Sequence, residues 1–521
     1  MADSTPFLSQ PNSEAPTQPE SHHLPSLDST IEKCIGEFGP AQFLQAILVS
    51  FAWFFDAQQT FVTVFTDAEP AWHWNNSNGT HLGNICLLDQ DSWSWDLPKH
   101  ASIISEWNLQ CASSFLAGLP ASGFFIGCLI GGIVLATLAD SFLGRKKMLL
   151  FSCLAMSIST FFTSFSTNIW IYSFLRFVCG FGRATIGTSA LVLATELVGK
   201  KWHAKVGVIG FFCFTLGFLS LPAMAYYNIG STWRNIYLWT SIPTIFYCLI
   251  VFYFVRESPR WLLVRGRKED AIATLRTMAQ FNHNTTLTMS FTNLPFQEGT
   301  SSENDDVYSA IKVLTQKKWA FRRLLSVMAI GFGIGLVYYG MPLALGNLSF
   351  NLYLSVTFNA LSELPASLVT FFLVGKLNRR TSLVFFTIIS SIFSIMSVLE
   401  GEIFAKLQIG LELVSFFSAC TAFNILLIFT IELFPTCVRN SAVSMVRQAL
   451  VFGGVFSPMV AAAGRENGLL SYGVFGLVIG CFGLFSVCLP ETRGRALSDT
   501  IDEEESKDRE CNRNGSGVGD V

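Results

Sequence analysis

ADSFLGRK, residues 139–146, ends the second long apolar run of the chain. A related turn, GKLNRR at 375–380, ends the eighth run, and Arg145 and Arg379 in these turns lie 234 residues apart. Acidic residues that close other runs repeat at nearly the same offset: Glu196 and Glu432, 236 residues apart, and Glu257 and Glu491, 234 residues apart. This common offset predicts two related halves of six spans each, an arrangement that in transporters surrounds a central cavity.

The composition is that of a membrane protein. Hydrophobic residues make up 51% of the 521 residues, and charged residues make up only 14%, roughly half the charged fraction of a soluble protein. Twelve apolar runs are long enough to cross about 30 Å of hydrocarbon as helices: 41–65, 115–139, 146–166, 168–195, 203–227, 233–255, 324–346, 350–375, 381–400, 407–431, 438–463 and 468–489. We therefore expect an all-α membrane protein with twelve transmembrane helices. The sequence has no concentrated basic face of the kind that binds nucleic acid. It also has no pair of Cys or His residues that would indicate a metal site.

Lys and Arg set the orientation, because loops that stay in the cytosol carry an excess of both. With both termini in the cytosol, most of the 34 Lys and Arg residues fall in cytosolic segments. Only Lys99, Arg234, Lys406 and Arg465 fall on the other side, and Arg176, Arg183 and Arg447 lie inside spans. The predicted organisation is a disordered cytosolic N-terminal tail (1–40), a first six-helix half (41–255) with a large non-cytosolic loop (66–114), a central cytosolic loop (256–323), a second six-helix half (324–489) and a cytosolic C-terminal tail (490–521).

The non-cytosolic loop carries modification signals. Its sequons begin at Asn75 and Asn78, and a third sequon, at Asn347, lies close to the membrane. These asparagines are the candidate glycosylation sites. Cys86 and Cys111 flank the polar part of the loop and would form a disulfide if the loop faces an oxidising space.

The central loop contains a helix signal. Ser258 and Pro259 are suited to the N-cap and the first position of a helix. We expect this helix to run towards Phe281.

Charged residues gather at the predicted cytosolic ends of the spans. Ion pairs at a membrane edge form and break at modest cost, because water is near. We expect such pairs to latch the two halves together when the cytosolic side is closed, the alternative being positively charged loops with compensating acids. The candidates are Asp140, Gly144, Arg145, Glu196, Glu257, Arg260, Glu432, Arg439 and Glu491.

Several strings resemble known families. The turn at 140–146, ESPRWLL at 257–263 and LPETRG at 489–494 are similar to the major facilitator superfamily, near its sugar porters, although three residues rather than the usual two separate Asp140 from Gly144. More specific strings resemble the organic cation/carnitine transporters: EWNLQC at 106–111, TELVGKKW at 195–202 and ELFPTCVRN at 432–440. FAWFFDAQQT at 51–60 resembles the plant branch of that family.

This resemblance spans about residues 40–500. It implies a major facilitator fold and secondary transport of organic cations or carnitine, without a cofactor. It also implies a vacuolar or plasma membrane.

Ionisable side chains inside the spans are costly and are therefore functional candidates. They are Asp56, Arg176, Arg183, Glu363, Glu412 and Arg447. Asp56 and Arg176 lie roughly 13 and 12 Å below the same non-cytosolic face, so we expect them to pair. Such a carboxylate keeps its charge beside the guanidinium and can take up a proton when the pair opens, which predicts proton coupling; the alternative is a static ion pair that joins two helices. We expect Glu412, near the outer end of its span, to be hydrated.

Glu363 lies roughly 20 Å below that face, near the midplane where substrates bind in such folds. The string NALSELP at 359–365, which includes Asn359, resembles the family at a position linked to cation binding. We expect Glu363 to be the counter-charge of a bound cation, the alternative being a partner for an arginine. Aromatic faces would complete the site, because a quaternary ammonium cannot donate a hydrogen bond. The aromatic candidates are Trp53, Tyr338, Tyr339 and Tyr353, each of which could instead face lipid or the core.

Arg447 indicates that the binding site also attracts a negatively charged group of the substrate. Aligned with the family, the position that selects the substrate's charge falls at Val451, which is neither acidic nor basic. Arg447 lies one turn earlier on the same helical face. It could pair with the carboxylate of a zwitterion such as carnitine, the alternative being a place in the cytosolic latch.

Other interpretations stay open. A proton-coupled sugar porter would need polyol-binding Gln or Asn residues, and the seventh span has none. A non-transporting receptor would need a longer folded tail. ATELVGKK at 194–201 faintly resembles a phosphate-binding loop through Gly199 and Lys200, but it follows a predicted helix rather than a strand. No nucleophile–base set indicates an enzyme.

Overall fold

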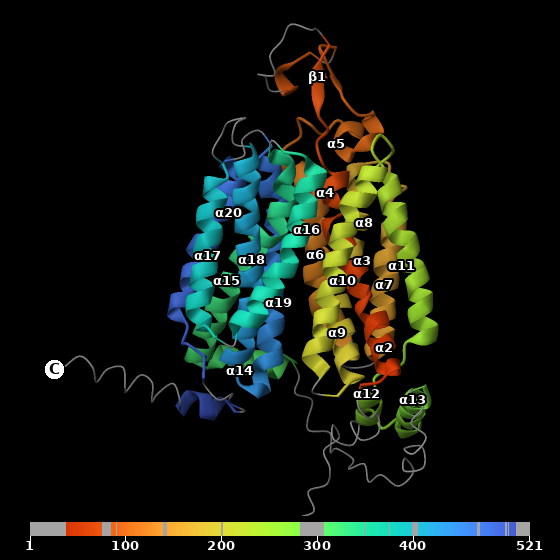
Figure 1. Cartoon of the computed structure of the whole chain (residues 1–521), viewed down its shortest axis with the longest axis vertical. Helices are drawn as coiled ribbons and strands as arrows, with labels where there is room; N and C mark the ends of the chain where they lie inside the picture. Colours follow the sequence, from red (N-terminus) through yellow and green to blue (C-terminus); the bar gives the residue numbers. More distant parts are fainter. Residues whose placement is uncertain are drawn as a thin grey trace, which may run out of the picture.

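The computed structural model is a bundle of long helices with a small hairpin at one end (Figure 1). It describes residues 38–75, 85–89, 91–138, 143–199, 202–281, 307–348, 350–374, 376–398, 405–465, 469–494, 498 and 500–506. The hairpin of β1 (Trp72–Trp74) and β2 (Trp93–Trp95) lies at the opposite end of the bundle from α13 (Lys268–Phe281). We call these the hairpin end and the α13 end.

The helices fall into two halves that lie side by side (Figure 1). The first half contains α2 (Pro40–Ser50), α3 (Ala52–Phe61), α4 (Thr63–Thr66), α6 (Ser114–Leu138), α7 (Arg145–Thr163), α8 (Ile169–Arg183), α9 (Ile186–Glu196), α10 (His203–Tyr227) and α11 (Arg234–Phe254). The second half contains α15 (Lys318–Ala344), α16 (Leu352–Val374), α17 (Arg379–Met396), α18 (Ala405–Leu433), α19 (Thr436–Ala463) and α20 (Val474–Gly483), with a π-helical turn (Leu469–Gly473) before α20 and a 3₁₀ turn (Leu484–Cys488) after it.

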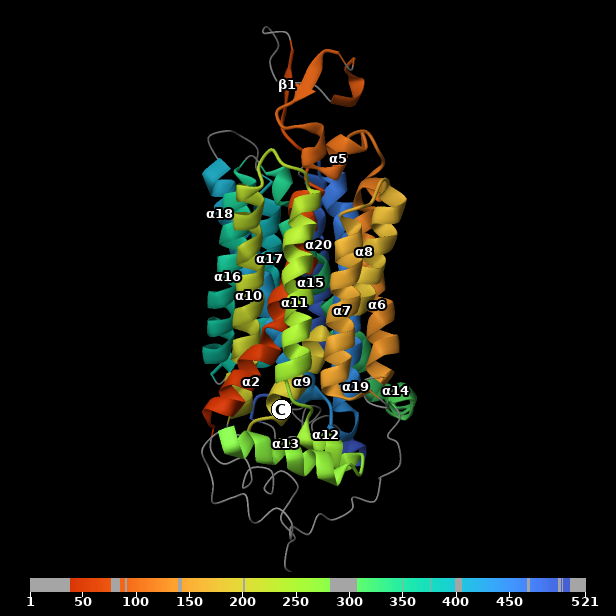
Figure 2. The same ribbon diagram turned by 90° about the vertical axis from the view of Figure 1, so that its right-hand side faces the viewer.

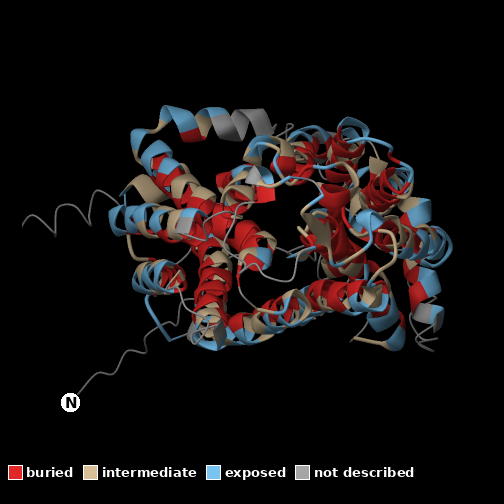
Figure 3. Cartoon of the chain, turned by 90° about the horizontal axis from the view of Figure 1, so that it is seen from above, coloured by how far each residue is buried: buried red, intermediate tan, exposed pale blue. Residues whose placement is uncertain are grey.

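Ten segments of the described residues are helical, long and apolar enough to cross a membrane. The pieces α2 to α4 form one of them, at Pro40–Thr66, and α8 and α9 form another, at Ile169–Glu196. α7 and α16 are not among the ten, yet they stand in the same bundle (Figure 2). Buried residues line the faces between helices, and exposed ones cover the rim (Figure 3). Large apolar side chains such as Trp170 and Phe174 are exposed, as a hydrocarbon surrounding favours.

Two pairs of helices make the largest contacts between the described parts of the two halves. α6 packs against α19, and α10 packs against α16. In the first pair, the hydroxyl of Ser122 donates a hydrogen bond to the carbonyl of Val455 at 2.8 Å. The ring of Phe125 lies 4.7 Å from that of Tyr339 on α15, so side chains of α6 reach the core of the second half.

The hairpin end is tied down by a disulfide and an ion pair. Cys86 and Cys111 are joined by a disulfide, with their Cα atoms 5.6 Å apart. Glu106, at the end of α5 (Ile103–Glu106), accepts hydrogen bonds from Arg234 at 2.7 and 2.8 Å and from the indole of Trp233 at 2.7 Å. Burial works against ionisation of Glu106, but these donors lower its pKa. The loop after α4 is thereby anchored to the start of α11.

The α13 end shows the same arrangement in each half. Glu257 accepts hydrogen bonds from the first two N–H groups of α7, both at 3.0 Å. Glu491 accepts hydrogen bonds from the first two N–H groups of α17, at 2.8 and 3.1 Å. Partners are 112 and 111 residues apart in both halves, in agreement with the offset of 234. A carboxylate at this position satisfies N–H groups that a helix cannot satisfy itself and complements the helix dipole.

The prediction of one helix that runs from Ser258 towards Phe281 is wrong in its extent. The Ser258 hydroxyl does accept the N–H of Trp261 at 3.1 Å, as an N-cap should. However, α12 (Pro259–Val264) ends before α13 begins. Gly266 lies between them with a φ of +72°, a backbone conformation that ends helices and favours glycine.

Gly144 provides a test of the Glu257 contact. Its φ of +83° and ψ of 169° belong to a region that almost only glycine occupies. A Cβ there would lie 2.7 Å from Oε2 of Glu257. We expect Gly144→Ala to destabilise the purified protein by about 1–3 kcal/mol in thermal unfolding, because it adds backbone strain and displaces the capping carboxylate.

Gly266→Ala is the matched control. Gly266 also has a positive φ, but nothing lies within 4 Å of the position that a Cβ would take there. It should therefore show backbone strain alone and a smaller loss. Equal losses in the two variants would contradict the role given to Glu257.

Candidate functional site

Glu363 lies between the two halves. It sits on α16, is 7% exposed, and accepts a hydrogen bond from the hydroxyl of Tyr338 on α15 at 2.7 Å. Its second oxygen accepts the hydroxyl of Thr215 on α10 at 3.3 Å. Thr215 belongs to the first half, so this carboxylate touches both. The sequence did not single out Thr215, because a threonine in an apolar helix has no distinguishing pattern.

No basic side chain of the described residues forms an ion pair with Glu363. The groups that hydrogen bond to it are neutral hydroxyls. The alternative role predicted for Glu363, as a partner of an arginine, is therefore not observed in this part of the chain. A buried carboxylate without a protein cation beside it is suited to a cationic ligand.

Aromatic rings connect Tyr338, the partner of Glu363, to both halves. The ring of Tyr338 lies 6.4 Å from that of Phe61 in the first half and 4.9 Å from that of Phe423 in the second. Nearer the hairpin end, Tyr353 stacks on Phe65, with centroids 5.7 Å apart. Aromatic faces are what can hold a quaternary ammonium, which has no N–H to donate.

Trp53 lies in the first half, away from Glu363. Its ring packs against Phe211 and Phe214 of α10, at 5.7 and 6.1 Å. Phe214 precedes Thr215, so Trp53 is connected to the Glu363 region through α10. No contact between Trp53 and Glu363 is found in the described residues.

Asp56 pairs with Arg183 and not with Arg176. Its two oxygens accept hydrogen bonds from Arg183 at 2.5 and 3.2 Å, and both side chains are largely buried. Arg176 instead donates to the carbonyl of Gln59 at 2.9 Å and covers the ring of Phe124 at 4.4 Å. The predicted pairing of Asp56 with Arg176 is therefore wrong.

The reason lies in the direction of side chains on a helix. Long side chains lean towards the N-terminus of their helix, which for α8 is the hairpin end. The Cα atom of Arg183 lies two turns further from the hairpin end than that of Arg176. Its guanidinium therefore reaches back towards that end, to the level of Asp56. Counting residues gave the depth of Cα atoms, whereas the charged group of an arginine lies several ångströms away from its Cα.

Arg447 lies near this pair. It is half-buried on α19 and close enough to Tyr339 and Arg183 to interact with both electrostatically. No acidic side chain of the described segments forms an ion pair with Arg447. Its position beside Tyr339 places it on the side of α15 that faces the first half, as the ring contact of Tyr339 with Phe125 also shows.

Asn359 and Glu412 bind each other inside the second half. The Asn359 amide donates to Glu412 at 3.1 Å and to the carbonyl of Ser355 at 3.2 Å, and both Asn359 and Glu412 are fully buried. The expectation that Glu412 is hydrated is wrong, because α16 covers it. The side chain of Asn359 is engaged with Glu412 on α18, and among the described residues its amide group forms no hydrogen bond with the other residues predicted to bind substrate.

The charged residues predicted to form a latch bind within their own halves. Glu432 accepts hydrogen bonds from Arg379 at 3.0 Å and from the hydroxyl of Thr492 at 2.6 Å. The guanidinium of Arg439 donates a hydrogen bond to the carbonyl of Phe434 at 3.2 Å. Among the described residues at the α13 end, no ion pair joins the two halves. Glu196 ends α9 and Arg260 is exposed on α12, while Asp140 lies outside the described residues. A latch between the halves therefore stays a prediction for another conformation.

The remaining predicted sites are partly described. Asn75 donates to the carbonyl of Asp91 at 2.9 Å on the hairpin, and Asn347 donates to that of Ala461 at 2.8 Å. Gly199 follows the helix α9, so the strand that a phosphate-binding loop requires is not there. Asn78 and Lys200 lie outside the described residues. The described residues contain no group of ligands for a metal ion.

Comparison with known proteins shows the family of the chain. Residues 43–458 match the family model described as Major Facilitator Superfamily. The chain is 64% identical to organic cation/carnitine transporter 3 of Arabidopsis thaliana, over 97% of this chain and 98% of that protein. It is 59% identical to organic cation/carnitine transporter 2 of the same plant, over 98% of each chain. Human organic cation/carnitine transporter 2 is 29% identical, over 79% of this chain and 73% of that protein.

Solved structures share the fold at low identity. The inward-open xylose transporter XylE from E. coli superposes with a TM-score of 0.59 and 18% identity, over 89% of this chain and 98% of that chain. The nucleoside transporter NupG superposes with a TM-score of 0.56 and 12% identity, over 86% and 98%. At these identities the likeness concerns the fold alone.

Proposed function

The chain belongs to the organic cation/carnitine transporters of the major facilitator superfamily, and we propose that it carries organic cations or carnitine across a membrane by alternating access. The observation that carries this proposal is the carboxylate of Glu363, buried between the halves and hydrogen bonded only to hydroxyls among the described residues. A site shared by two halves changes its access when the halves rock. The polyol-binding amides that a sugar porter would need are missing from α15.

We further propose twelve membrane-spanning helices with both termini in the cytosol. Ten spans meet the criteria of length and apolarity, and α7 and α16 stand beside them. The excess of Lys and Arg then lies at the α13 end, which is thus the cytosolic side. The hairpin end faces the other side of a vacuolar or plasma membrane, with Asn75, Asn78 and Asn347 as candidate glycosylation sites.

The charged residues at the α13 end are the proposed cytosolic gate. Glu257 and Glu491 hold the loops of their own halves in place. This leaves the ends of the halves as preformed surfaces. We propose that they meet when the cytosolic side closes, with Glu196, Glu432 and Arg439 near the contact.

Glu363→Gln tests the cation site. The variant keeps the shape and the contacts with Tyr338 and Thr215 but removes the negative charge. We expect the uptake of radiolabelled choline into proteoliposomes to fall at least about tenfold, a loss of about 1.4 kcal/mol or more.

Glu412→Gln is the matched control, because it makes the same change at a buried carboxylate that faces α16 and not the interface between the halves. It should keep most of the uptake. If Glu363→Gln transported choline as well as the unmodified protein, the cation site would lie elsewhere.

Arg447 supports a zwitterionic substrate. It is a half-buried cation beside Tyr339, and Tyr339 adjoins Tyr338 with ring centroids 5.1 Å apart. Glu363 and the aromatic rings would hold the ammonium group of carnitine, and Arg447 would hold its carboxylate.

Arg447→Gln should therefore separate two substrates. We expect carnitine uptake to fall about tenfold or more, the effect of losing a charge-assisted hydrogen bond. Choline, which has no carboxylate, should be transported as before, and its uptake serves as the internal control. An equal loss of both substrates would instead favour a role for Arg447 in the cytosolic latch.

We also propose proton coupling at Asp56, now through Arg183. Asp56 and Arg183 form a largely buried ion pair in this conformation. Rocking that separates α3 from α8 would leave the carboxylate desolvated without its partner, a situation that favours proton uptake. The alternative, a static pair that joins two helices, predicts no link to protons.

Asp56→Asn should abolish the stimulation of uptake by an imposed pH gradient. Because one lone buried guanidinium can cost about 3–5 kcal/mol of stability, the double variant Asp56→Asn/Arg183→Gln provides a second, charge-free comparison. Choline uptake with and without the gradient is the measurement. Full dependence on the gradient in either folded variant would rule out coupling at this pair.

A further inference from the structure

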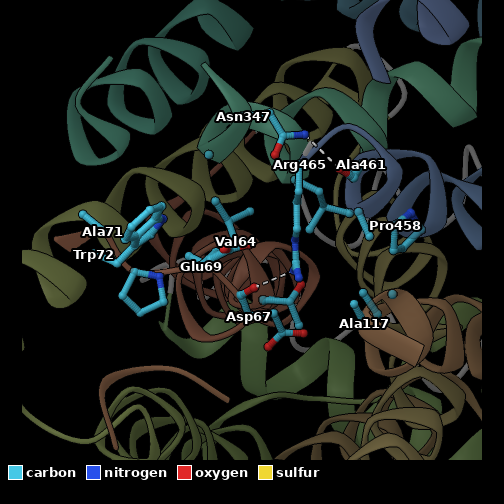
Figure 4. A pocket seen from close by; sticks show the side chains of 18 residues that line it. Val64, Asp67, Glu69, Ala71, Trp72, Ala117, Asn347, Pro458, Ala461 and Arg465 are labelled. Atoms are coloured by element: carbon cyan, nitrogen blue, oxygen red, sulfur yellow. Dashed lines mark hydrogen bonds between the residues drawn. The ribbon is translucent and has the colours of Figure 1, made fainter. Parts of the chain in front are cut away.

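A cavity lies between the halves at the hairpin end (Figure 4). Its volume is about 290 Å³, at the small end of the range for ligand pockets. Its walls come from the end of α4 and the following loop, from α6, and from the ends of α15 and α19. It is therefore closed by both halves, as the Glu363 site is.

Two carboxylates and one guanidinium face this cavity. Asp67 and Glu69 lie just after α4, and Arg465 lies just after α19. Arg465 donates a hydrogen bond to the backbone carbonyl of Asp67 at 3.2 Å. The carboxylate of Glu69 lies close enough to act on Arg465 electrostatically. A cation of the second half thus lies among acidic residues of the first.

Asp67 is held in place but keeps one oxygen for a ligand. Its Oδ1 accepts the hydroxyls of Tyr172 at 2.7 Å and Thr66 at 2.8 Å. Its Oδ2 is buried and has no hydrogen-bond partner among the described residues. Burial raises the pKa of Asp67 to about 6, against the lowering effect of these hydroxyls and of the charges of Arg176 and Arg465. The carboxylate is therefore ionised at pH 7.

Trp72 completes the lining with an aromatic ring. An aromatic face and a carboxylate are the two features that attract a quaternary ammonium. The cavity is distinct from the Glu363 site, because neither Glu363 nor its partners Tyr338 and Thr215 line it. The stacked rings of Phe65 and Tyr353 lie on the way between them.

We propose that Asp67, Glu69 and Trp72 form an outer binding site for the cationic group of the substrate, and that the guanidinium of Arg465 occupies this site when the hairpin end is closed. An arriving cation replaces Arg465, which releases the contact between the halves and opens the path inward. Arg465 therefore acts as a built-in substitute for the substrate. This proposal rests on the proposed transport of organic cations, which supplies the ligand class.

Thiol labelling of the full-length protein in proteoliposomes tests the site without requiring transport. Gly346→Cys places a thiol on the cavity wall, where a side chain meets nothing within 4 Å. Two methanethiosulfonates are compared at pH 7.5, one with a trimethylammonium head and one with a sulfonate head. Labelling of the chain with Gly346 intact is subtracted, because Cys437, Cys481 and Cys488 are also exposed.

The measured quantity is the labelling rate of the trimethylammonium reagent divided by that of the sulfonate reagent. We expect this ratio to be about tenfold higher at Gly346→Cys than for a free thiol, because a cleft lined by charges of one sign concentrates counter-ions. Asp67→Asn and Glu69→Gln should each lower this ratio, and Arg465→Gln should raise it. Millimolar choline should slow the trimethylammonium reagent by occupying the site.

Asp96→Asn is the matched control. Asp96 belongs to the same loop but is exposed and pairs with His73, outside the cavity. It should leave the ratio unchanged. The proposal would be overturned if Asp67→Asn and Glu69→Gln left the ratio unchanged, or if Asp96→Asn lowered it equally. It would also be overturned if choline did not slow the labelling.

The outcomes also separate this site from the central one. Glu363→Gln should lower choline transport at least about tenfold and leave labelling at Gly346→Cys as it was. Normal labelling ratios in a protein that never transports choline would refute the proposed function while the outer site stands. Transport without any charge preference at Gly346→Cys would refute the outer site alone.

Discussion

A charge buried between helices in hydrocarbon has to be matched by another charge or by a ligand, and this constraint organises the interior of the protein. Asp56 meets it with Arg183, whose guanidinium reaches both carboxylate oxygens. Glu363 meets hydroxyls but no cation of the described residues. In the first arrangement the carboxylate has a cationic partner within the protein, whereas in the second the partners are neutral. This contrast between the two carboxylates is the reason why we propose Glu363, and not Asp56, as the counter-charge of a cationic substrate.

The halves are built to keep their own shape while the contact between them changes. The carboxylates of Glu257 and Glu491 cap helices of the half to which they belong, with the same spacing in sequence. By contrast, the contacts between halves are single hydrogen bonds and ring contacts, such as Ser122 with Val455 and Phe125 with Tyr339. Separating these contacts leaves the caps by Glu257 and Glu491 intact, since each of these carboxylates belongs to the same half as the helix that it caps. Rigid-body rocking is therefore less costly than deformation within a half.

Sequence reasoning was most reliable where one property varies along the chain. Hydropathy gave the first span as 41–65, and the helical segment is Pro40–Thr66, because the cost of exposing polar backbone to hydrocarbon sets the length. The same reasoning predicted the Ser258 N-cap but could not foresee that Gly266 breaks the helix. It failed where direction around a helix matters. The partner of Asp56 and the burial of Glu412 both depend on which neighbour a side chain faces, and apolar periodicity is weak in helices that are hydrophobic all round.

The positions of the acids, at the hairpin end and at mid-depth, indicate why the transporter would need more than one. A quaternary ammonium loses attractive hydration when it enters a bundle, and one carboxylate at mid-depth cannot offset that cost at the entrance. Asp67 and Glu69 supply negative charge at the hairpin end, and the rings of Phe65, Tyr353, Phe61 and Tyr338 lie between that end and Glu363. A cation moving inward would pass from carboxylates to aromatic faces and then to a carboxylate again. When the path is closed and no substrate is bound, Arg465 compensates the negative charge of the acidic residues at the entrance.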